Sequence, residues 1–303
     1  MRNGEGRREA SRQVPPILPD HEGKGFRLRD HDPGDTRGFK SEQKREARTL
    51  LARGIEWLAE EQEKLYAQDR WGVLLVFQAM DAAGKDSTIK HVMSGVNPQG
   101  VHVTSFKAPS SEELDHDFMW RCVKALPERG CIGIFNRSYY EEGLVVRVHK
   151  EFLAKQKLPP QLLTKGVWKE RYEDIASFER YLARNGYLIL KFFLHVSRDE
   201  QKKRFLERLD EPEKNWKFAP GDVKERNYWD DYMKAYEDTI RHTAAPHAPW
   251  YVVPADNKWF TQLVVAAAIV HGIEQLDLRF PAVDATAEKE FGECRKWLLA
   301  EKD

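Results

Sequence analysis

Five short apolar runs, each followed by a segment with helical periodicity, constrain the fold of this chain more than any other feature. The runs are rich in β-branched and aromatic residues and lie at 73–77, 101–106, 131–135, 187–196 and 250–253. Continuous apolar strands separated by amphipathic helices are typical of a parallel sheet covered by helices on both faces. We therefore expect an α/β fold with a parallel five-stranded sheet.

Local signals mark several of the intervening helices. The segment 41–70 has apolar side chains at helical spacing, at Leu51, Ile55, Leu58 and Leu65. This spacing predicts a long amphipathic helix. Capping boxes predict two further helix starts, at Ser110 with Glu113 and at Ser197 with Glu200. Glycine in "RNG" at 184–186 predicts a helix end.

The ends of the chain differ from its middle in composition. Residues 1–40 are rich in proline, glycine and charge, which predicts a flexible N-terminal arm whose segment 26–36 is a candidate to lie on the body. We expect a catalytic domain at 41–285, with a lid at about 198–225, and a helical tail at 286–303. The N-terminus has no apolar signal region, and the aliphatic run at 263–270 is shorter than the roughly 20 residues of a membrane span. We therefore expect a cytoplasmic protein with a buried helix at 263–270.

Charge and cysteine content narrow the classes of function. Lysine plus arginine equals aspartate plus glutamate, at 49 each, so no global field favours nucleic acid or membrane, and a polyanion site requires a local cluster. Cys122, Cys131 and Cys294 have no CxxC spacing. We interpret them as reduced thiols that act as small buried hydrophobes rather than metal ligands.

The stretch "QAMDAAGKDSTIK" after the first strand has the context of a phosphate-binding loop. Such a loop directs backbone N–H groups at an anion from the first turn of a helix, while a lysine reaches the terminal phosphates. Compared with the usual pattern, Ala79 replaces the first glycine and Asp86 replaces the hydroxyl residue. An ordinary strand-to-helix turn is the alternative. The candidate phosphate-binding residues are Ala82, Ala83, Gly84, Lys85, Asp86 and Ser87.

Two acids in this loop indicate a metal ion. A carboxylate beside bound phosphates is repulsive unless a divalent cation lies between them, and magnesium shares hard oxygen ligands between carboxylate and phosphate. Asp81 is the first candidate for a magnesium ligand. Asp86 either binds the metal through water or favours the positive end of the helix.

The third strand and a later charged helix supply the other candidates. That strand ends in Asn136, where aspartate would be usual, and Arg137 follows it as a candidate to neutralise a transferring phosphoryl group, with a surface salt bridge as the alternative. Arg204 and Arg208 share a helix face and lead into a loop punctuated by proline and glycine, the pattern of a mobile lid. Tyr228, Tyr232 and Tyr236 are interpreted as core packing.

The ordered motifs closely resemble the type 2 polyphosphate kinases. They are "QAMDAAGKDSTIKHVMSGVNPQG", "IGIFNRSYYE", "ERLDEPEKNWKF" and "ERNYWDDYMKAYED", within a similarity that covers about 26–280. The resemblance implies a P-loop kinase fold, related to thymidylate kinases, with a helical lid. It also implies transfer of phosphoryl groups between inorganic polyphosphate and nucleotides, with magnesium.

The resemblance also assigns roles to residues. Asp81, Lys85 and Asp86 look like the family's Walker A acids and lysine, Arg137 like its Walker B arginine, and Arg204 and Arg208 like its lid arginines. Asn136 and Glu141 look like the subgroup that accepts both nucleoside mono- and diphosphates, with Glu141 as a further metal candidate and Lys214 as a nucleotide-site candidate. Ser87 and Tyr139 stand where glycine and histidine are frequent in that subgroup.

These patterns lead to one principal hypothesis and two alternatives. We expect a polyphosphate:AMP/ADP phosphotransferase that acts on AMP, ADP and ATP, with guanine nucleotides left open, and that forms a homo-oligomer. The first alternative is an ATP-dependent nucleotide kinase of the same fold, which fold analogy alone supports. The second is a protein that binds polyphosphate without turnover.

Overall fold

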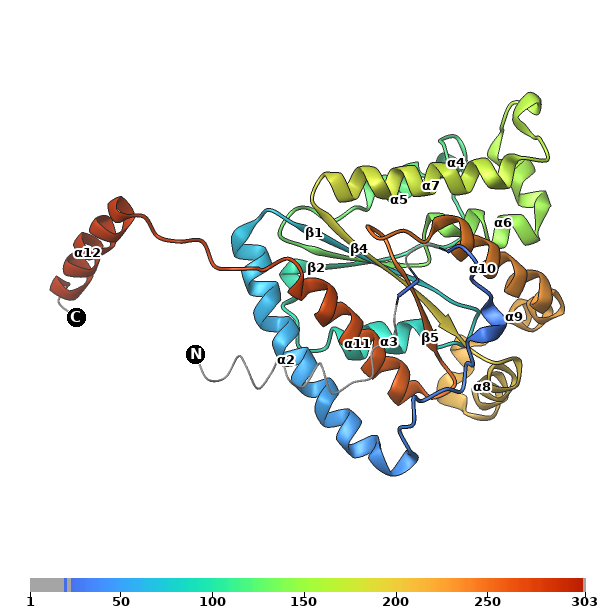
Figure 1. Cartoon of the computed structure of the whole chain (residues 1–303), viewed down its shortest axis with the longest axis horizontal. Coiled ribbons are helices and arrows are strands. Elements are labelled where there is room, and N and C mark those ends of the chain that lie inside the picture. The colour runs from blue at the N-terminus through green and yellow to red at the C-terminus, as the bar shows by residue number, and fades with distance from the viewer. Residues whose placement is uncertain (1–18, 21–22, 302–303) are drawn as a thin grey trace.

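A five-stranded, all-parallel sheet forms the centre of the molecule, in the order β2-β3-β1-β4-β5 (Figure 1). The computed structural model describes residues 19–20 and 23–301. The strands are β1 (Gly72–Gln78), β2 (Val101–Ser105), β3 (Ile132–Asn136), β4 (Tyr187–His195) and β5 (Trp250–Pro254). The predicted fold class is confirmed, and each strand lies within one residue of its predicted bounds.

Helices cover both faces of the sheet (Figure 1). One face carries α2 (Lys44–Gln68), α3 (Lys85–Val92) and α11 (Lys258–Glu274), and the other carries α7 (Val167–Arg184) and α10 (Trp229–Thr243). The remaining α-helices are α4 (Ser111–Leu114), α5 (Trp120–Lys124), α6 (Val145–Val148), α8 (Arg198–Asp210), α9 (Pro220–Glu225) and α12 (Ala285–Ala300). Short 3₁₀ turns are η1 (Leu28–Asp30), η2 (Ser41–Gln43), η3 (Pro98–Gly100), η4 (Tyr139–Glu142), η5 (Lys150–Gln156), η6 (Pro160–Leu162), η7 (Pro212–Lys217) and η8 (Arg226–Tyr228).

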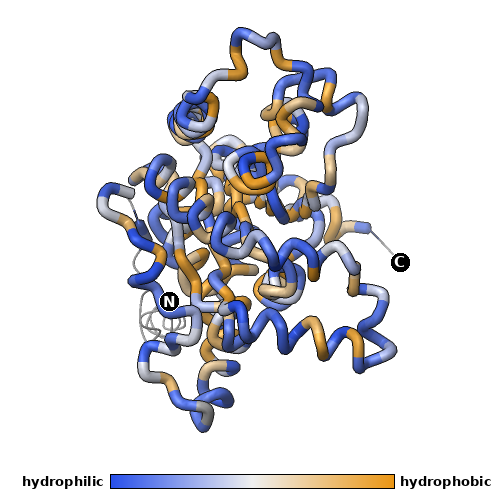
Figure 2. The backbone as a smooth tube through the Cα atoms, turned by 90° about the vertical axis from the view of Figure 1, so that its right-hand side faces the viewer, coloured by the Kyte–Doolittle hydropathy of each residue, from blue (hydrophilic) through white to orange (hydrophobic). Residues whose placement is uncertain are grey.

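Burial follows the predicted pattern. Every residue of β1 is buried, as expected for the middle strand of a sheet covered on both faces. The backbone in Figure 2 is most hydrophobic in the centre of the molecule. The aliphatic run at 263–270 lies in α11, and every residue of the run except Ala267 is buried. Among the described residues, none of the helices is both long and apolar enough to cross a membrane.

One of the two predicted capping boxes is complete. Ser110 accepts from the N–H of Glu113, and the carboxylate of Glu113 accepts from the N–H of Ser110. At α8, Ser197 accepts from the N–H of Glu200 at 3.1 Å, but the carboxylate of Glu200 instead accepts from Arg204 at 2.9 Å. The second box is therefore half formed, because an arginine one turn along competes for its glutamate.

A buried cluster of polar side chains ties β4 to the turn after β3. Lys191 and Glu179 are fully buried, with 2.6 Å between Nζ and Oε2. Lys191 also donates to the hydroxyl of Tyr140 and to the carbonyl of Thr243, so all three ammonium hydrogens have partners. The hydroxyls of Tyr139 and Tyr140 both donate to Glu179 Oε1. We call Tyr139, Tyr140, Glu179 and Lys191 the closed cluster.

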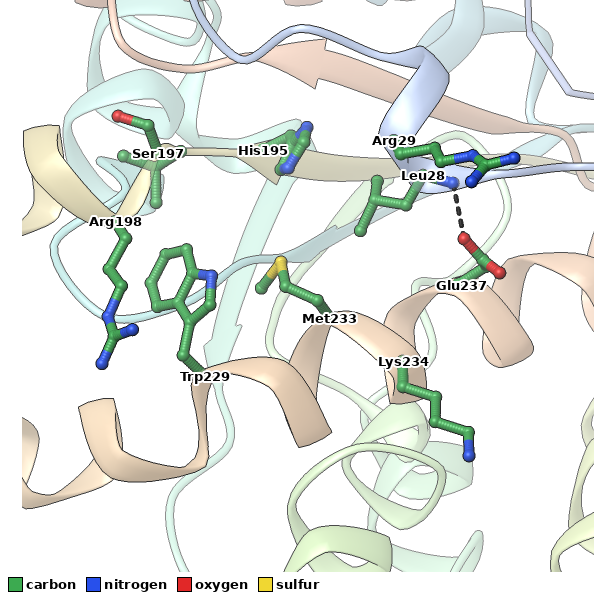
Figure 3. A pocket seen from close by; sticks show the side chains of 10 residues that line it. Leu28, Arg29, His195, Ser197, Arg198, Trp229, Met233, Lys234 and Glu237 are labelled. Atoms are coloured by element: carbon green, nitrogen blue, oxygen red, sulfur yellow. Dashed lines mark hydrogen bonds between the residues drawn. The ribbon is translucent and has the colours of Figure 1, made fainter.

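Part of the N-terminal arm lies on the body. Phe26 and Leu28 are buried, and the N–H of Leu28 donates to Glu237 at 2.8 Å (Figure 3). Leu28, His195, Trp229 and Met233 surround a cavity of about 410 Å³ at the end of β4. The part of the predicted flexible arm at 1–18 and 21–22 lies outside the described residues.

At the other end, α12 lies away from the body (Figure 1) and exposes Phe291, Trp297, Leu298 and Leu299. It carries Cys294, which is exposed, so that cysteine is not the buried hydrophobe that we expected. Cys122 and Cys131 are buried as predicted, and burial raises the pKa of Cys122 to about 12, which leaves an unreactive thiol.

The tyrosine stripe is core in two of three positions. Tyr232 and Tyr236 are buried on α10, whereas Tyr228 precedes the helix and is 40% exposed. The helical period predicted the packing of the first two and failed for Tyr228, because α10 begins at Trp229.

Candidate active site

The predicted phosphate loop runs from Ala79 to Gly84, between β1 and α3. Two of its residues have left-handed backbone, Ala82 with φ +61° and Gly84 with φ +107°. Glycine adopts this conformation freely, whereas alanine is strained, and such strain gathers at functional sites. No side chain caps the N-terminus of α3. Its first N–H groups are therefore available to an anion.

Lys85 is the first residue of α3 and is 9% exposed. Its Nζ donates to the carbonyl of Ala79 at 2.8 Å, at the start of the loop. Burial lowers the pKa of Lys85, and the carboxylate of Asp81 opposes that change. A bound phosphate would place negative charge next to the Lys85 ammonium and would favour its protonated form, which suits the predicted role.

Asp81 and Arg137 form an ion pair across the loop. The distance from Arg137 Nη2 to Asp81 Oδ1 is 3.0 Å, and both side chains are about one third exposed. Arg137 follows β3 with φ +64°, and its guanidinium also lies 3.8 Å from Glu141. Glu141 and Asp81 raise the pKa of Arg137. The salt bridge that we considered as an alternative is present, within the walls of the cavity described below.

Asp86 and Asn136 meet at the ends of α3 and β3. The amide of Asn136 donates to Asp86 Oδ1 at 2.6 Å. Both line the cavity. The sequence prediction that the β3 end supplies the second half of the site agrees with this placement.

Glu141 contacts a residue of the cavity wall but does not line the cavity itself. It is not among the described residues that line the cavity, and it contacts Arg137 at 3.8 Å. Gln78 donates to it at 2.9 Å when its amide is oriented to satisfy both ends. Burial raises the pKa of Glu141, and Arg137 opposes that change. A metal-binding role for Glu141 stays a prediction.

The predicted lid forms one wall of the site. A cavity of about 710 Å³ is lined by the phosphate loop, the end of β2, the end of β3 and residues of α8, η7 and α9. Arg208 donates to the carbonyl of Lys217 and lies 3.8 Å from Asp222. Lys214 pairs with Glu211 at 2.6 Å. Trp216 is 79% exposed in η7, a large apolar surface that a bound substrate could cover.

Arg204 differs from Arg208, although they share a helix face. Its side chain is 4% exposed, and its five N–H groups are engaged by protein: Nε by Glu200, Nη1 by the carbonyls of Ala82 and Ala83, and Nη2 by those of Ala255 and Asp256. These contacts support the phosphate loop from behind. The family role as a lid arginine stays a prediction for Arg204, and no N–H is left for a substrate in this arrangement.

The cavity concentrates positive charge in a neutral chain. Its walls carry eight basic side chains and four acidic ones. The basic residues are Lys85, Lys107, Arg137, Arg204, Arg208, Lys214, Lys217 and Lys258, and the acidic ones are Asp81, Asp86, Glu207 and Asp222. This is the local cluster that the charge balance requires for a polyanion site.

The acidic side chains fit a metal that is shared with phosphates. Within residues 19–20 and 23–301, no group of three or more His, Cys, Asp or Glu side chains could hold a metal by itself. Magnesium keeps several waters and binds through one or two carboxylates plus phosphate oxygens, so a preformed cage is not required. Asp81 and Asp86 provide such carboxylates at the mouth of the loop.

Some residues of the site were not singled out from the sequence. Lys107, Lys217, Asp222 and Lys258 line the cavity. Gln201 and Arg226 lie behind the phosphate loop, joined by a hydrogen bond of 2.6 Å. A glutamine in a charged helix has no motif. Its spacing to Arg204, one turn away, was the only available hint.

Comparisons with known proteins decide the family. The family model described as "Polyphosphate kinase 2 (PPK2)" matches residues 40–281. The chain belongs to the polyphosphate kinase 2 family. Its members are polyphosphate-dependent phosphotransferases of nucleotides, and they use a divalent metal, so the expected enzyme class is confirmed.

Individual relatives are similar over most of their length. The chain is 51% identical to an ADP-polyphosphate phosphotransferase of Rhodopseudomonas palustris, over 85% of this chain and 90% of the relative. It is 47% identical to an AMP/ADP-polyphosphate phosphotransferase of Meiothermus ruber, over 87% and 94%. The crystal structure of polyphosphate kinase 2 from Arthrobacter aurescens matches with a TM-score of 0.80 and 39% identity, over 92% of this chain and 99% of that one.

Proposed function

We propose that this polyphosphate kinase 2 transfers phosphoryl groups from inorganic polyphosphate to both AMP and ADP, reversibly and with magnesium. The observation that carries the proposal is the charged cavity, in which the phosphate loop, the Asp81–Arg137 pair and the lid cations Arg208 and Lys214 meet. A cavity of about 710 Å³ has room for a nucleotide and part of a phosphate chain.

The residues act by position and charge. The loop N–H groups and Lys85 bind phosphate oxygens, and Arg137 neutralises charge on the phosphoryl group in transfer. Asp81 and Asp86 would hold magnesium, and the ion would supply positive charge that offsets the negative charge of the phosphates. In-line transfer needs no phosphorylated side chain.

The lid segment (residues 198–225) is proposed to close over the substrates. Arg208 and Lys214 line the same cavity as Lys85. Exposed Leu206, Leu209, Trp216 and Val223 give this segment apolar surface that closure would cover. Closure excludes water, which otherwise competes as a phosphoryl acceptor.

Acceptance of AMP as well as ADP rests on Asn136 and Glu141. Both match the sequence of the subgroup that uses both acceptors, and Glu141 lies 3.8 Å from Arg137, which lines the cavity. The relatives from R. palustris and M. ruber have names that differ on this point, ADP alone and AMP/ADP. Adenine as the preferred base is part of the proposal.

Two assays test the function. Purified protein with AMP, long-chain polyphosphate and magnesium is expected to form ADP and then ATP, while Lys85→Ala protein forms neither at a comparable rate. Formation of ADP only from added ATP, without use of polyphosphate, would instead support an ATP-dependent nucleotide kinase. Binding of polyphosphate with no product across several chain lengths would support the binding protein.

Location and assembly complete the proposal. A cytoplasmic site of action agrees with free cysteines at 122, 131 and 294. Association into a homo-oligomer is supported by the apolar side chains that α12 exposes, Phe291, Trp297, Leu298 and Leu299. Light scattering on the purified chain tests it, and a monomer at micromolar concentration would contradict it.

A further inference from the structure

Helix α8 holds three successive carbonyls of the phosphate loop. Gln201 Nε2 donates to the carbonyl of Asp81 at 2.9 Å. One turn along, Arg204 Nη1 donates to the carbonyls of Ala82 at 3.0 Å and Ala83 at 2.8 Å. Gln201 is 1% exposed and Arg204 is 3% exposed, so these bonds form away from bulk water. The first two turns of α8 therefore fix the back of the loop.

These bonds determine which face of the loop backbone meets a phosphate. In a trans peptide the carbonyl and the N–H of the same unit point in opposite directions. Carbonyls of Asp81 and Ala83 that face α8 leave the N–H groups of Ala82 and Gly84 directed away from it. Carbonyl oxygens repel an anion, whereas successive N–H groups attract one. The side chains of α8 thus hold the loop in an anion-binding arrangement.

The orientation of the Gln201 amide depends on a third residue. Arg226 Nη1 donates to Gln201 Oε1 at 2.6 Å, which leaves the amide nitrogen to donate to the carbonyl of Asp81. Without Arg226 the amide could turn its oxygen toward that carbonyl, which has no hydrogen to donate.

Arg226 directly follows the lid segment. It also donates to the carbonyl of Arg198 at 3.0 Å, and Arg198 donates back to the carbonyl of Arg226 at 3.4 Å. The chain enters the lid at Arg198, at the start of α8, and has left it at Trp229, at the start of α10. Figure 3 shows these two residues side by side. Gln201 therefore links Arg226, where the chain returns from the lid segment, to Asp81, the proposed metal ligand.

We propose that Gln201 is a positioning residue for polyphosphate binding: with its amide oriented by Arg226, it holds the carbonyl of Asp81 away from the bound phosphates and connects the ends of the lid segment to the phosphate loop. This inference rests on the proposed function, because the anion that it concerns is the phosphate chain. It assigns no contact with substrate to Gln201.

The test measures anion binding apart from turnover. Gln201→Met keeps the length and volume of the side chain but cannot donate to Asp81. Calorimetry with tripolyphosphate, without nucleotide, is expected to give a dissociation constant about tenfold higher than that of the wild type, equal to roughly 1.4 kcal/mol. In steady state, KM for polyphosphate rises while the dissociation constant for AMP stays within about twofold. Arg226→Met, which frees the amide, gives a smaller rise of about threefold.

Gln62→Met is the matched control, because Gln62 is a buried glutamine (2% exposed) on α2, outside the cavity. It is expected to leave tripolyphosphate affinity unchanged. Equal affinity of wild type and Gln201→Met would overturn the inference and leave the polyphosphate function intact. If Gln201→Met does not fold, unchanged affinity in Arg226→Met overturns it. A wild type that binds no tripolyphosphate would overturn the function itself.

Discussion

Two charged clusters share one short turn of this protein, and they are built in opposite ways. Tyr139 and Tyr140 belong to the closed cluster, where Lys191 and Glu179 are fully buried. Arg137, at the start of the same turn, belongs with Asp81, Lys85 and Glu141 to what we call the open cluster. Its Asp81–Arg137 pair is about one third exposed.

The difference between the two clusters matches a structural role for the closed cluster and a substrate-binding role for the open cluster. In the closed cluster each ammonium hydrogen and each tyrosine hydroxyl has a partner at 2.6–2.9 Å, so nothing is left to bind a ligand. In the open cluster Arg137 has φ +64°, and Lys85 is held only by a backbone carbonyl. Strained backbone and exchangeable partners are expected where charged side chains must interact with a substrate. The four predictions below test this contrast.

The largest effect is expected from opening the closed cluster. Lys191→Met leaves Glu179 buried without its cation, which should lower the free energy of unfolding by about 3–5 kcal/mol. Chemical unfolding measures this loss. The double variant Lys191→Met/Glu179→Gln should recover much of it. Single and double variants of equal stability would show that the loss does not come from the unpaired Glu179 carboxylate.

Next are the two central residues of the open cluster. Lys85→Ala and Asp81→Asn should each slow transfer at least about a hundredfold, equal to roughly 2.7 kcal/mol, because a principal electrostatic stabiliser is lost. Asp81→Asn should also raise the metal concentration needed for half-maximal rate. Lys90→Ala, an exposed lysine on the same helix α3, is the control for unspecific charge loss. Rates within a few fold of wild type would remove these residues from the catalytic machinery.

A smaller effect is expected at the lid. Arg208→Ala should lower kcat about thirtyfold, roughly 2 kcal/mol, and weaken nucleotide binding less, because its contact matters most when charge develops in transfer. The exposed Lys202 on α8 provides the control variant Lys202→Ala. A change in KM alone would mean that Arg208 merely binds substrate.

The smallest predicted effect concerns the choice of acceptor. Glu141→Asn removes the carboxylate that contacts Arg137, and it should reduce AMP phosphorylation relative to ADP phosphorylation by about tenfold, or roughly 1.4 kcal/mol. Glu142→Gln is the matched control, since the neighbouring acid instead accepts from Gln156 and should leave the ratio unchanged. Both rates are measured on one preparation with its melting temperature. An AMP to ADP ratio that does not move would discard the role.

Local patterns were enough to predict most of the fold. Strands and helices follow from hydrophobic period, and the loop at 79–84 follows from a buried strand that leads into Gly84 and Lys85. The placement of Arg137 beside Asp81 followed from the rule that parallel strands end at one edge. These inferences need only short segments or the order of strands.

The features of the site that were not predicted from the sequence depend on long-range contacts between side chains and backbone carbonyls. Arg204 appeared equivalent to Arg208 because helical spacing places both on one face, yet its partners are carbonyls of residues 82, 83, 255 and 256. A carbonyl has no sequence identity, so no residue pattern reports such a contact. The same reason hides Gln201. Glu141 was predicted to take part in the site, but it is not among the described residues that line the cavity, and spacing does not encode the side-chain packing that separates it from the cavity.

The strand order also determines when the site can come into being during synthesis. β1 lies between β3 and β4, both of which leave the ribosome after it, and the phosphate loop is supported by Arg204 through the carbonyl of Asp256. A nascent chain that ends before β5 therefore carries the loop and α8, but it lacks the carbonyls of Ala255 and Asp256 that hold the Nη2 group of Arg204. Parallel pairing between distant segments is slow and exposes unpaired strands meanwhile. The last support of the phosphate loop, the bonds from Arg204 to the carbonyls of Ala255 and Asp256, is thus acquired only when the end of β5 has joined the sheet.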